Sequence, residues 1–244
     1  TVQAGGDDNS YATIGHGGQS ATGNHGVAGN TIDVLVGNDI DLLGGDGNNR
    51  WVQIGMGGLA TAGTHDADIH VTSTNGSITM TAGTNTGGDD AYVQIGNGAT
   101  QVASNTQGVV KVSAINGSVD MTAGGGQVGG GVENANFVQI GHGGHTSSGN
   151  HGSGNDLVAV IAGELTMTGG ASGVDEAYVQ VGHGGFGSNG NLADDIQIDL
   201  TGNGATTGNL VINGGTGGSE AYAAIGHGGV LDGPVVQRED PHLE

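Results

Sequence analysis

Little of what stabilises an ordinary globular protein is present in this chain of 244 residues. It contains no cysteine, which excludes a disulfide framework and a thiolate metal site. Aromatic residues are only 3% of the chain and apolar residues 34%, so few large side chains are available to fill a wide core. A thin core of Val, Ile, Leu and Met needs fewer of them, and the composition therefore favours an elongated fold.

Positive charge is also scarce. Arg50, Lys111 and Arg238 stand against 24 acidic residues, which gives a formal net charge of −21. Such a surface repels nucleic acid and anionic membranes and attracts cations. No run of 18 apolar residues predicts a membrane-spanning helix. No signal peptide is recognisable and the chain starts at Thr1, so we interpret it as a piece of a longer protein.

Glycine, by contrast, is abundant. The chain has 56 glycines but no glycine at every third position and only two prolines, which excludes collagen. Low hydrophobicity combined with a high net charge is also typical of disordered chains. The apolar residues nevertheless recur in short, regularly spaced runs, and this favours an ordered fold.

Six similar segments reveal an internal repeat. Each starts with an aromatic residue and continues with a pattern such as Tyr92-Val-Gln-Ile-Gly-Asn-Gly-Ala99, and they recur every 40 to 45 residues. Repeats of this period are typical of solenoids. We number the repeats one to six by these segments, which are 11–18, 51–58, 92–99, 137–144, 178–185 and 222–229.

Two further runs lie between successive segments, and nearly all of them alternate apolar and polar residues. This period of two predicts half-buried strands. The corners between the two runs carry Gly37-Asn38, Asn75-Gly76 or Asn116-Gly117, residues that tolerate the positive φ we expect there. The first run comprises 32–36, 69–71, 110–112, 157–161 and 196–200, and the second comprises 40–42, 78–80, 119–121, 165–167 and 210–212.

We therefore predict an all-β fold, a parallel β-helix (β-solenoid) with three short strands per turn, about 42 residues per turn and five to six turns. A single solenoid is expected over 1–229, followed by an irregular acidic tail, cap or linker over 230–244. The side chains predicted to fill the core are Val52, Ile54, Val93, Ile95, Val138, Ile140, Val179, Val181, Ile78, Met80, Val119, Met121, Leu165 and Met167.

Residues 75–83 and 116–124, which read Asn-Gly-Ser-Ile-Thr-Met-Thr-Ala-Gly and Asn-Gly-Ser-Val-Asp-Met-Thr-Ala-Gly, resemble the repeats of filamentous haemagglutinin-like adhesins. The resemblance covers the first two strands of most repeats. It implies a right-handed β-helix, secretion to an extracellular or cell-surface location, and a role in adhesion or surface structure.

The aromatic position of the repeat and the glutamine two residues later form the first candidate site. In register they would make two ladders, which stabilise parallel sheets through stacked rings and stacked amides. The alternative function is a sugar-binding strip, if the long loop leaves the rings uncovered. The ladder residues are Tyr11, Trp51, Tyr92, Phe137, Tyr178, Tyr222, Gln53, Gln94, Gln139 and Gln180.

Histidine and acidic residues form the second and third candidates. His142, His183 and His227 share one repeat position, and stacked imidazoles either bind a transition metal or bond backbone carbonyls. Acidic loops before the aromatic segments make either a calcium site or a solvated acidic edge. The acidic candidates are Asp46, Asp89, Asp90, Asp175 and Glu176.

An interrupted threonine array, which includes Thr79, Thr81 and Thr122, is a minor candidate for ice binding. The regular pattern offers no nucleophile constellation and only Lys111 as a mid-chain cation, so we predict no enzyme. The expected function is a structural or adhesive stalk segment of an extracellular bacterial surface protein or fibre. The alternatives are a self-assembling filament subunit or a calcium-, metal- or glycan-binding module. Expected partners are adjoining repeats, neighbouring copies, glycans or a host or cell surface.

Overall fold

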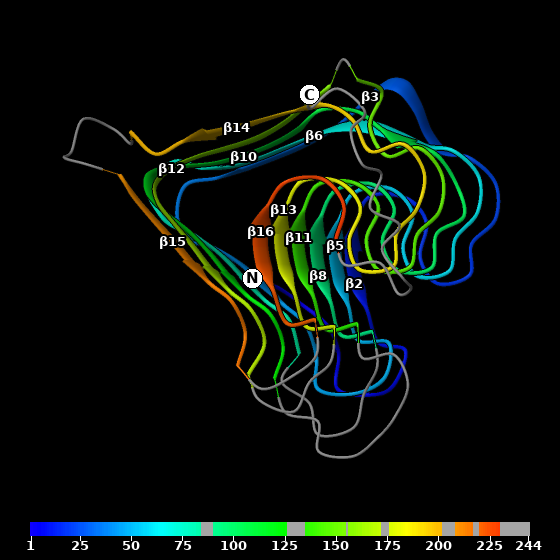
Figure 1. Ribbon diagram of the computed structural model, residues 1–244, viewed down its shortest axis with the longest axis horizontal. Helices are drawn as coiled ribbons and strands as arrows, with labels where there is room; N and C mark the ends of the chain where they lie inside the picture. Colours follow the sequence, from blue (N-terminus) through cyan, green and yellow to red (C-terminus); the bar gives the residue numbers. More distant parts are fainter. Residues whose placement is uncertain are drawn as a thin grey trace, which may run out of the picture.

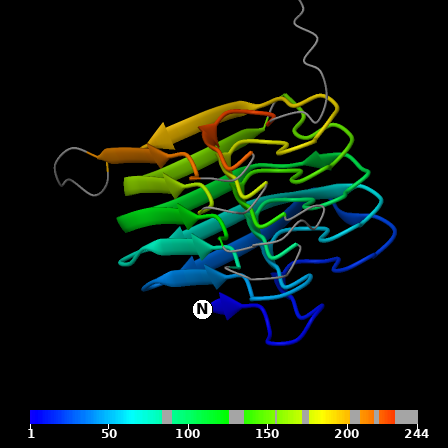
Figure 2. The same cartoon turned by 60° about the horizontal axis from the view of Figure 1, so that its bottom comes forward.

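The structure is a computed structural model that describes residues 1–83, 90–125, 135–154, 156–171, 176–201, 208–216 and 220–229. Within these residues it is strand-rich and contains no helix, and all strand pairs are parallel. The strands stack from the N-terminus upward, as Figure 2 shows, and enclose a narrow interior in Figure 1. An all-β, parallel arrangement is thus confirmed, and it is compatible with a parallel β-solenoid.

The first sheet has six strands, one from each repeat segment, in the order β16-β13-β11-β8-β5-β2. Pairing is in register, so that Gln94 lies between Gln53 and Gln139. The aromatic residue of each repeat immediately precedes its strand. The strands are β2 (Ala12–Ile14), β5 (Val52–Ile54), β8 (Val93–Ile95), β11 (Val138–Ile140), β13 (Val179–Val181) and β16 (Ala223–Ile225).

The second sheet contains the other ten strands. Figure 1 shows it bending around the first sheet, with β6, β10, β12 and β14 on one wall and β15 on the next. Its strands are β1 (Val2–Gln3), β3 (His25–Val36), β4 (Ile40–Leu43), β6 (His65–Ser73), β7 (Ile78–Thr81), β9 (Thr106–Gln107), β10 (Val110–Thr122), β12 (Leu157–Thr168), β14 (Asp195–Asp199) and β15 (Asn209–Asn213).

The corners between the two predicted runs differ from the expectation. In repeats three and four the runs join into single bent strands, β10 and β12, with a register irregularity between Ala114 and Ser118. None of the six corner residues Gly37, Asn38, Asn75, Gly76, Asn116 and Gly117 has a positive φ. Glycine is required at Gly117 for another reason, since a Cβ there would overlap the carbonyl of Gly76 in the preceding repeat.

The long glycine-rich loops of repeats one to five are also ordered in register. Parallel bridges connect Ala62 to Ala103, Ala103 to Ser148 and Ser148 to Asn189. A second row connects Thr106 to His151 and His151 to Leu192. The loops therefore form a further stacked wall, which the sequence did not predict because their polar and small residues do not alternate with apolar ones.

The core lies between the two sheets and follows the predicted pattern. All fourteen side chains predicted for it are fully buried, from Val52 in repeat two to Val181 in repeat five. A second apolar cluster lies on the other side of the first sheet, around Trp51, Tyr92, Phe137 and Tyr178. The segment strands of the interior repeats are thus buried on both faces, whereas β6 and β7 alternate buried and partly buried residues, as expected for half-buried strands.

Candidate functional site

The aromatic residues form a continuous stack. Neighbouring ring centroids lie 4.3 to 5.5 Å apart, and the planes differ by no more than 7°. Trp51, Tyr92, Phe137 and Tyr178 are fully buried, while Tyr11 in repeat one is 39% exposed. Leu59, Ala99 and Phe186 from the loop wall pack against the stack. The interior rings therefore offer no face to a sugar, and their contribution is packing.

The glutamines are in register, but their amides do not bond one another. The Nε2 of Gln94 donates to the carbonyls of Gly141 (2.9 Å) and Gly143 (2.6 Å) in the following repeat. Gln139 does the same toward Gly182 (2.9 Å) and Gly184 (2.6 Å). Each glutamine thus satisfies carbonyls of the irregular backbone after the next strand, where the sheet ladder has ended.

Glycine at the fifth position of the segment makes these contacts possible. Gly96 has a φ of +157°, and a Cβ on it would overlap the carbonyl of Gly141. Gly55 and Gly141 meet the carbonyls of Gly96 and Gly182 in the same way. The spacing between repeats is therefore short enough at this position that only glycine fits.

The histidine column is held by hydrogen bonds on both ring nitrogens. The N–H of Asn97 donates to Nδ1 of His142 (3.0 Å), and the N–H of His142 donates to Nδ1 of His183 (2.9 Å). On the other side, Nε2 of His142 lies 2.6 Å from the Gly108 carbonyl, and Nε2 of His183 lies 3.0 Å from the Asp194 carboxylate. His227 continues the pattern toward the carbonyl of Asp194 (2.8 Å).

This pattern requires the neutral ring with its proton on Nε2, because Nδ1 accepts a hydrogen bond. Burial is the main reason that the pKa of His142 lies well below its usual value, and it also lowers the pKa of His183. The rings stack with centroids 4.8 and 5.0 Å apart. Since both nitrogens of each ring are engaged, the column in this arrangement has no lone pair to offer a metal ion.

Asn97 replaces histidine in this column in repeat three, and the sequence alone did not predict its hydrogen bonds. Its Oδ1 accepts from the N–H of Met56 (2.9 Å), as the histidine Nδ1 does elsewhere. Its Nδ2 donates to the carbonyls of Ala67 (2.8 Å) and Gln107 (2.7 Å). The available signal was its place at the histidine position of repeat three.

A second set of buried histidines lies in the loop wall. His65 contacts Thr61 (3.0 Å) and Ser104 (2.8 Å), and His151 contacts Thr106 (2.8 Å) and Ser147 (3.1 Å). Burial, followed by the neighbouring His25, lowers the pKa of His65 to about 4. Burial, followed by the neighbouring His183, lowers the pKa of His151 to about 4. These rings are neutral at pH 7 and bond hydroxyl groups.

The acidic candidates have separate surroundings. Asp90 and Glu176 both take a left-handed backbone with φ of 59° two residues before their aromatic residue. The Glu176 carboxylate lies 2.7 Å from Nε2 of His145, and the main-chain carbonyl of Asp46 accepts from Arg50. Asp89 and Asp175 lie outside the described residues. Within the described part of the chain, no group of three or more His, Asp or Glu side chains is placed to hold a metal ion.

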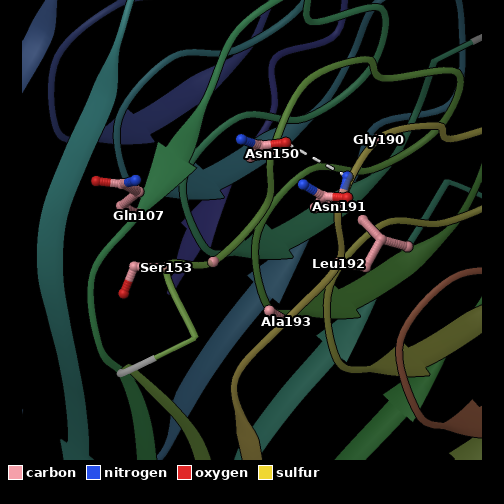
Figure 3. A pocket seen from close by; sticks show the side chains of 8 residues that line it. Gln107, Asn150, Ser153, Gly190, Asn191, Leu192 and Ala193 are labelled. Atoms are coloured by element: carbon pink, nitrogen blue, oxygen red, sulfur yellow. Dashed lines mark hydrogen bonds between the residues drawn. The ribbon is translucent and has the colours of Figure 1, made fainter.

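The loop wall also carries an open groove of about 740 Å³. Figure 3 shows Gln107 and Ser153 on one side of it, and Asn191 and Leu192 on the other. The groove lies where repeat four has extra chain: Thr106 and Val110 are four residues apart, but their partners His151 and Val158 are seven apart. Its lining residues are Gln107, Asn150, Gly152, Ser153, Gly190, Asn191, Leu192 and Ala193.

Most polar groups of the groove are amides, and they suit a ligand with hydroxyl groups. The Oδ1 of Asn150 accepts from the N–H of Asn191 (3.4 Å), which fixes the orientation of that amide. Amides both donate and accept, as sugar hydroxyls do, and Leu192 adds an apolar contact. The groove therefore offers hydrogen-bonding groups that match those of a neutral saccharide, which the buried aromatic stack does not.

No protein-family model, curated protein or solved structure matches the chain. No helix among the described residues is long and apolar enough to cross a membrane.

Proposed function

We propose that the chain is a structural, adhesive stalk segment of an extracellular bacterial surface protein, without enzymatic activity. In this proposal it is a right-handed β-helix with three short strands and about 42 residues per turn, and the runs 75–83 and 116–124 resemble the repeats of filamentous haemagglutinin-like adhesins. Adjoining repeats or neighbouring copies are its structural partners.

One observation carries the proposal: unbroken columns of side chains run from repeat to repeat. Rings stack on rings, glutamines bond the next repeat, and apolar residues stack in the core. Such columns resist shear along the strands cooperatively, because each interior repeat is bonded to both neighbours by parallel hydrogen bonds. This is the property that a stalk under load requires.

Single-molecule pulling between the two ends tests this role. If whole repeats unfold one at a time, the extension should increase in steps of about 140 Å, the extended length of about 42 residues. A smooth rise in force without steps, as for a disordered chain, would contradict the stalk proposal. The far-UV circular dichroism spectrum of the same sample checks that it is β-rich.

A second candidate function, glycan binding, is favoured by the groove of Figure 3. An array of neutral glycans probed with the labelled chain tests it. Asn191→Ala removes an exposed amide of the groove, and Asn24→Ala is a control from repeat one, outside the groove. Binding that both variants retain equally would place the glycan elsewhere.

A further inference from the structure

A second pocket, of about 510 Å³, lies on the second sheet and shares no lining residue with the amide-lined groove. Its lining residues come from β6, β10 and β12. These three strands are neighbours in the second sheet (Figure 1). The side chains of the pocket alternate with buried core residues such as Val71 and Val112. The pocket is lined by His70, Thr72, Lys111, Ser113, Ile115 and Ile161.

Lys111 is the only lysine of the chain. Its side chain is exposed, and it forms no ion pair with any described residue. The nearest acidic position in register, Asp33, is engaged by Nδ1 of His70 at 2.9 Å. In a protein with a net charge of −21, this pocket therefore presents a cation that no described carboxylate neutralises.

Ser113 adds a polar side chain to the lining of the pocket. The residue is only 5% exposed, and its hydroxyl makes no hydrogen bond among the described residues. The hydroxyl is therefore available to donate to or accept from a ligand group in the pocket. Thr72 adds a second hydroxyl beside it, since Thr72 and Ser113 are paired in register.

We propose that this pocket binds one carboxylated sugar, a ligand of the uronic acid class. The Lys111 ammonium pairs with the carboxylate, because a charge-assisted hydrogen bond is the strongest contact available there. The hydroxyls of Ser113 and Thr72 bond ring hydroxyls, and Ile115 and Ile161 pack against the C–H face of the ring. Since Lys111 is the one cation of the pocket, we expect a ligand with one carboxylate.

The strand register shows that this cation occurs at one position of the described sheet only. The positions equivalent to Lys111 on the neighbouring strands are Asp33, His70, Ala159 and Gln197. None of them is a lysine or an arginine. The inference is therefore independent of the stalk proposal, which rests on what the repeats share.

The sole lysine permits a single-site measurement. With ¹³C-labelled lysine, one Cε resonance reports Lys111, and galacturonate and galactose are compared as probes that differ in the carboxylate. We expect a saturable shift with galacturonate, at a dissociation constant on the order of millimolar, and none with galactose. Equal responses to the two sugars, or no response to either, would overturn the proposal.

Variants separate binding from folding, which circular dichroism monitors. With labelled isoleucine methyls, Ile115 and Ile161 report the pocket and the buried Ile54 reports the core. Lys111→Met should weaken galacturonate binding about tenfold or more, and Ser113→Ala by a smaller factor. Lys111→Arg should restore most of the affinity. Unchanged galacturonate affinity in folded Lys111→Met would exclude this pocket as the site.

Discussion

Glycine at the fifth position of the repeat segment shows how one residue sets the distance between repeats. Gly96 and Gly226 have the same φ of +157°, so an L-residue is strained equally at both. Their surroundings differ, because a Cβ on Gly96 overlaps the carbonyl of Gly141, whereas a Cβ on Gly226 meets no described atom within 4 Å. Substitutions at Gly96 and Gly226 therefore distinguish the cost of backbone strain from the cost of steric overlap.

We predict that Gly96→Ala lowers the free energy of unfolding by about 3 kcal/mol or more, since strain and overlap add. Gly226→Ala, with the strain alone, should cost about 1 kcal/mol. Urea denaturation midpoints of the two variants and the parent measure the difference. Equal losses would mean that the carbonyl contact does not limit the spacing.

At the scale of the element, the central strand β8 depends on its apolar side chains for its place in the sheet. Ile95 is fully buried and paired in register with Ile54 and Ile140. We predict that Ile95→Asp unfolds or frays the middle repeats, because a buried carboxylate without a partner costs several kcal/mol. Thermal melting followed by circular dichroism measures the loss.

Ile225→Asp in β16 is the matched control, since Ile225 occupies the same position of the segment and is only partly buried. We expect it to lower the melting temperature less than Ile95→Asp. If Ile95→Asp kept the melting temperature of the parent, the assignment of β8 to the core would be wrong.

The sequence predicted strands mainly where apolar and polar residues alternate along the segment. The runs around Ile78 and Val119 were predictable as parallel strands, because one face is apolar and the other polar. The loop wall was not, since its buried His65, Thr106 and His151 are stabilised by specific hydrogen bonds that no periodicity reveals. The histidine column was found as a repeat position, but its bonding depends on Asp194, a residue outside the repeated segment.

For the molecule as a whole, buried neutral histidines are the feature that responds most directly to acid. Their hydrogen bonds come from different repeats, with Asn97 and His183 on either side of His142, and Ser104 against His65. Among the described residues, carboxylates form ion pairs with two of the buried rings: Asp194 faces His183, and Glu176 faces His145. Protonation of a ring would therefore disturb contacts between repeats as well as contacts within one.

The folded pKa of His65 and of His151 is about 4, below the ordinary value of 6.5, so the folded state binds fewer protons than the unfolded state. The contribution of these residues to the free energy of unfolding is therefore fully present above about pH 6.5 and is lost as the pH falls toward 4. We predict a loss of roughly 2 kcal/mol for each residue between pH 7 and 5, measured as urea midpoints along a pH series. His151→Leu, which introduces the residue that repeat five has at this position, should reduce the pH dependence by the contribution of one histidine. Asn24→Ala, which removes no titratable group, should leave the profile unchanged. A profile that His151→Leu does not alter would show that this ring accepts a proton in the folded state, and that the loop wall opens to water before the sheets do.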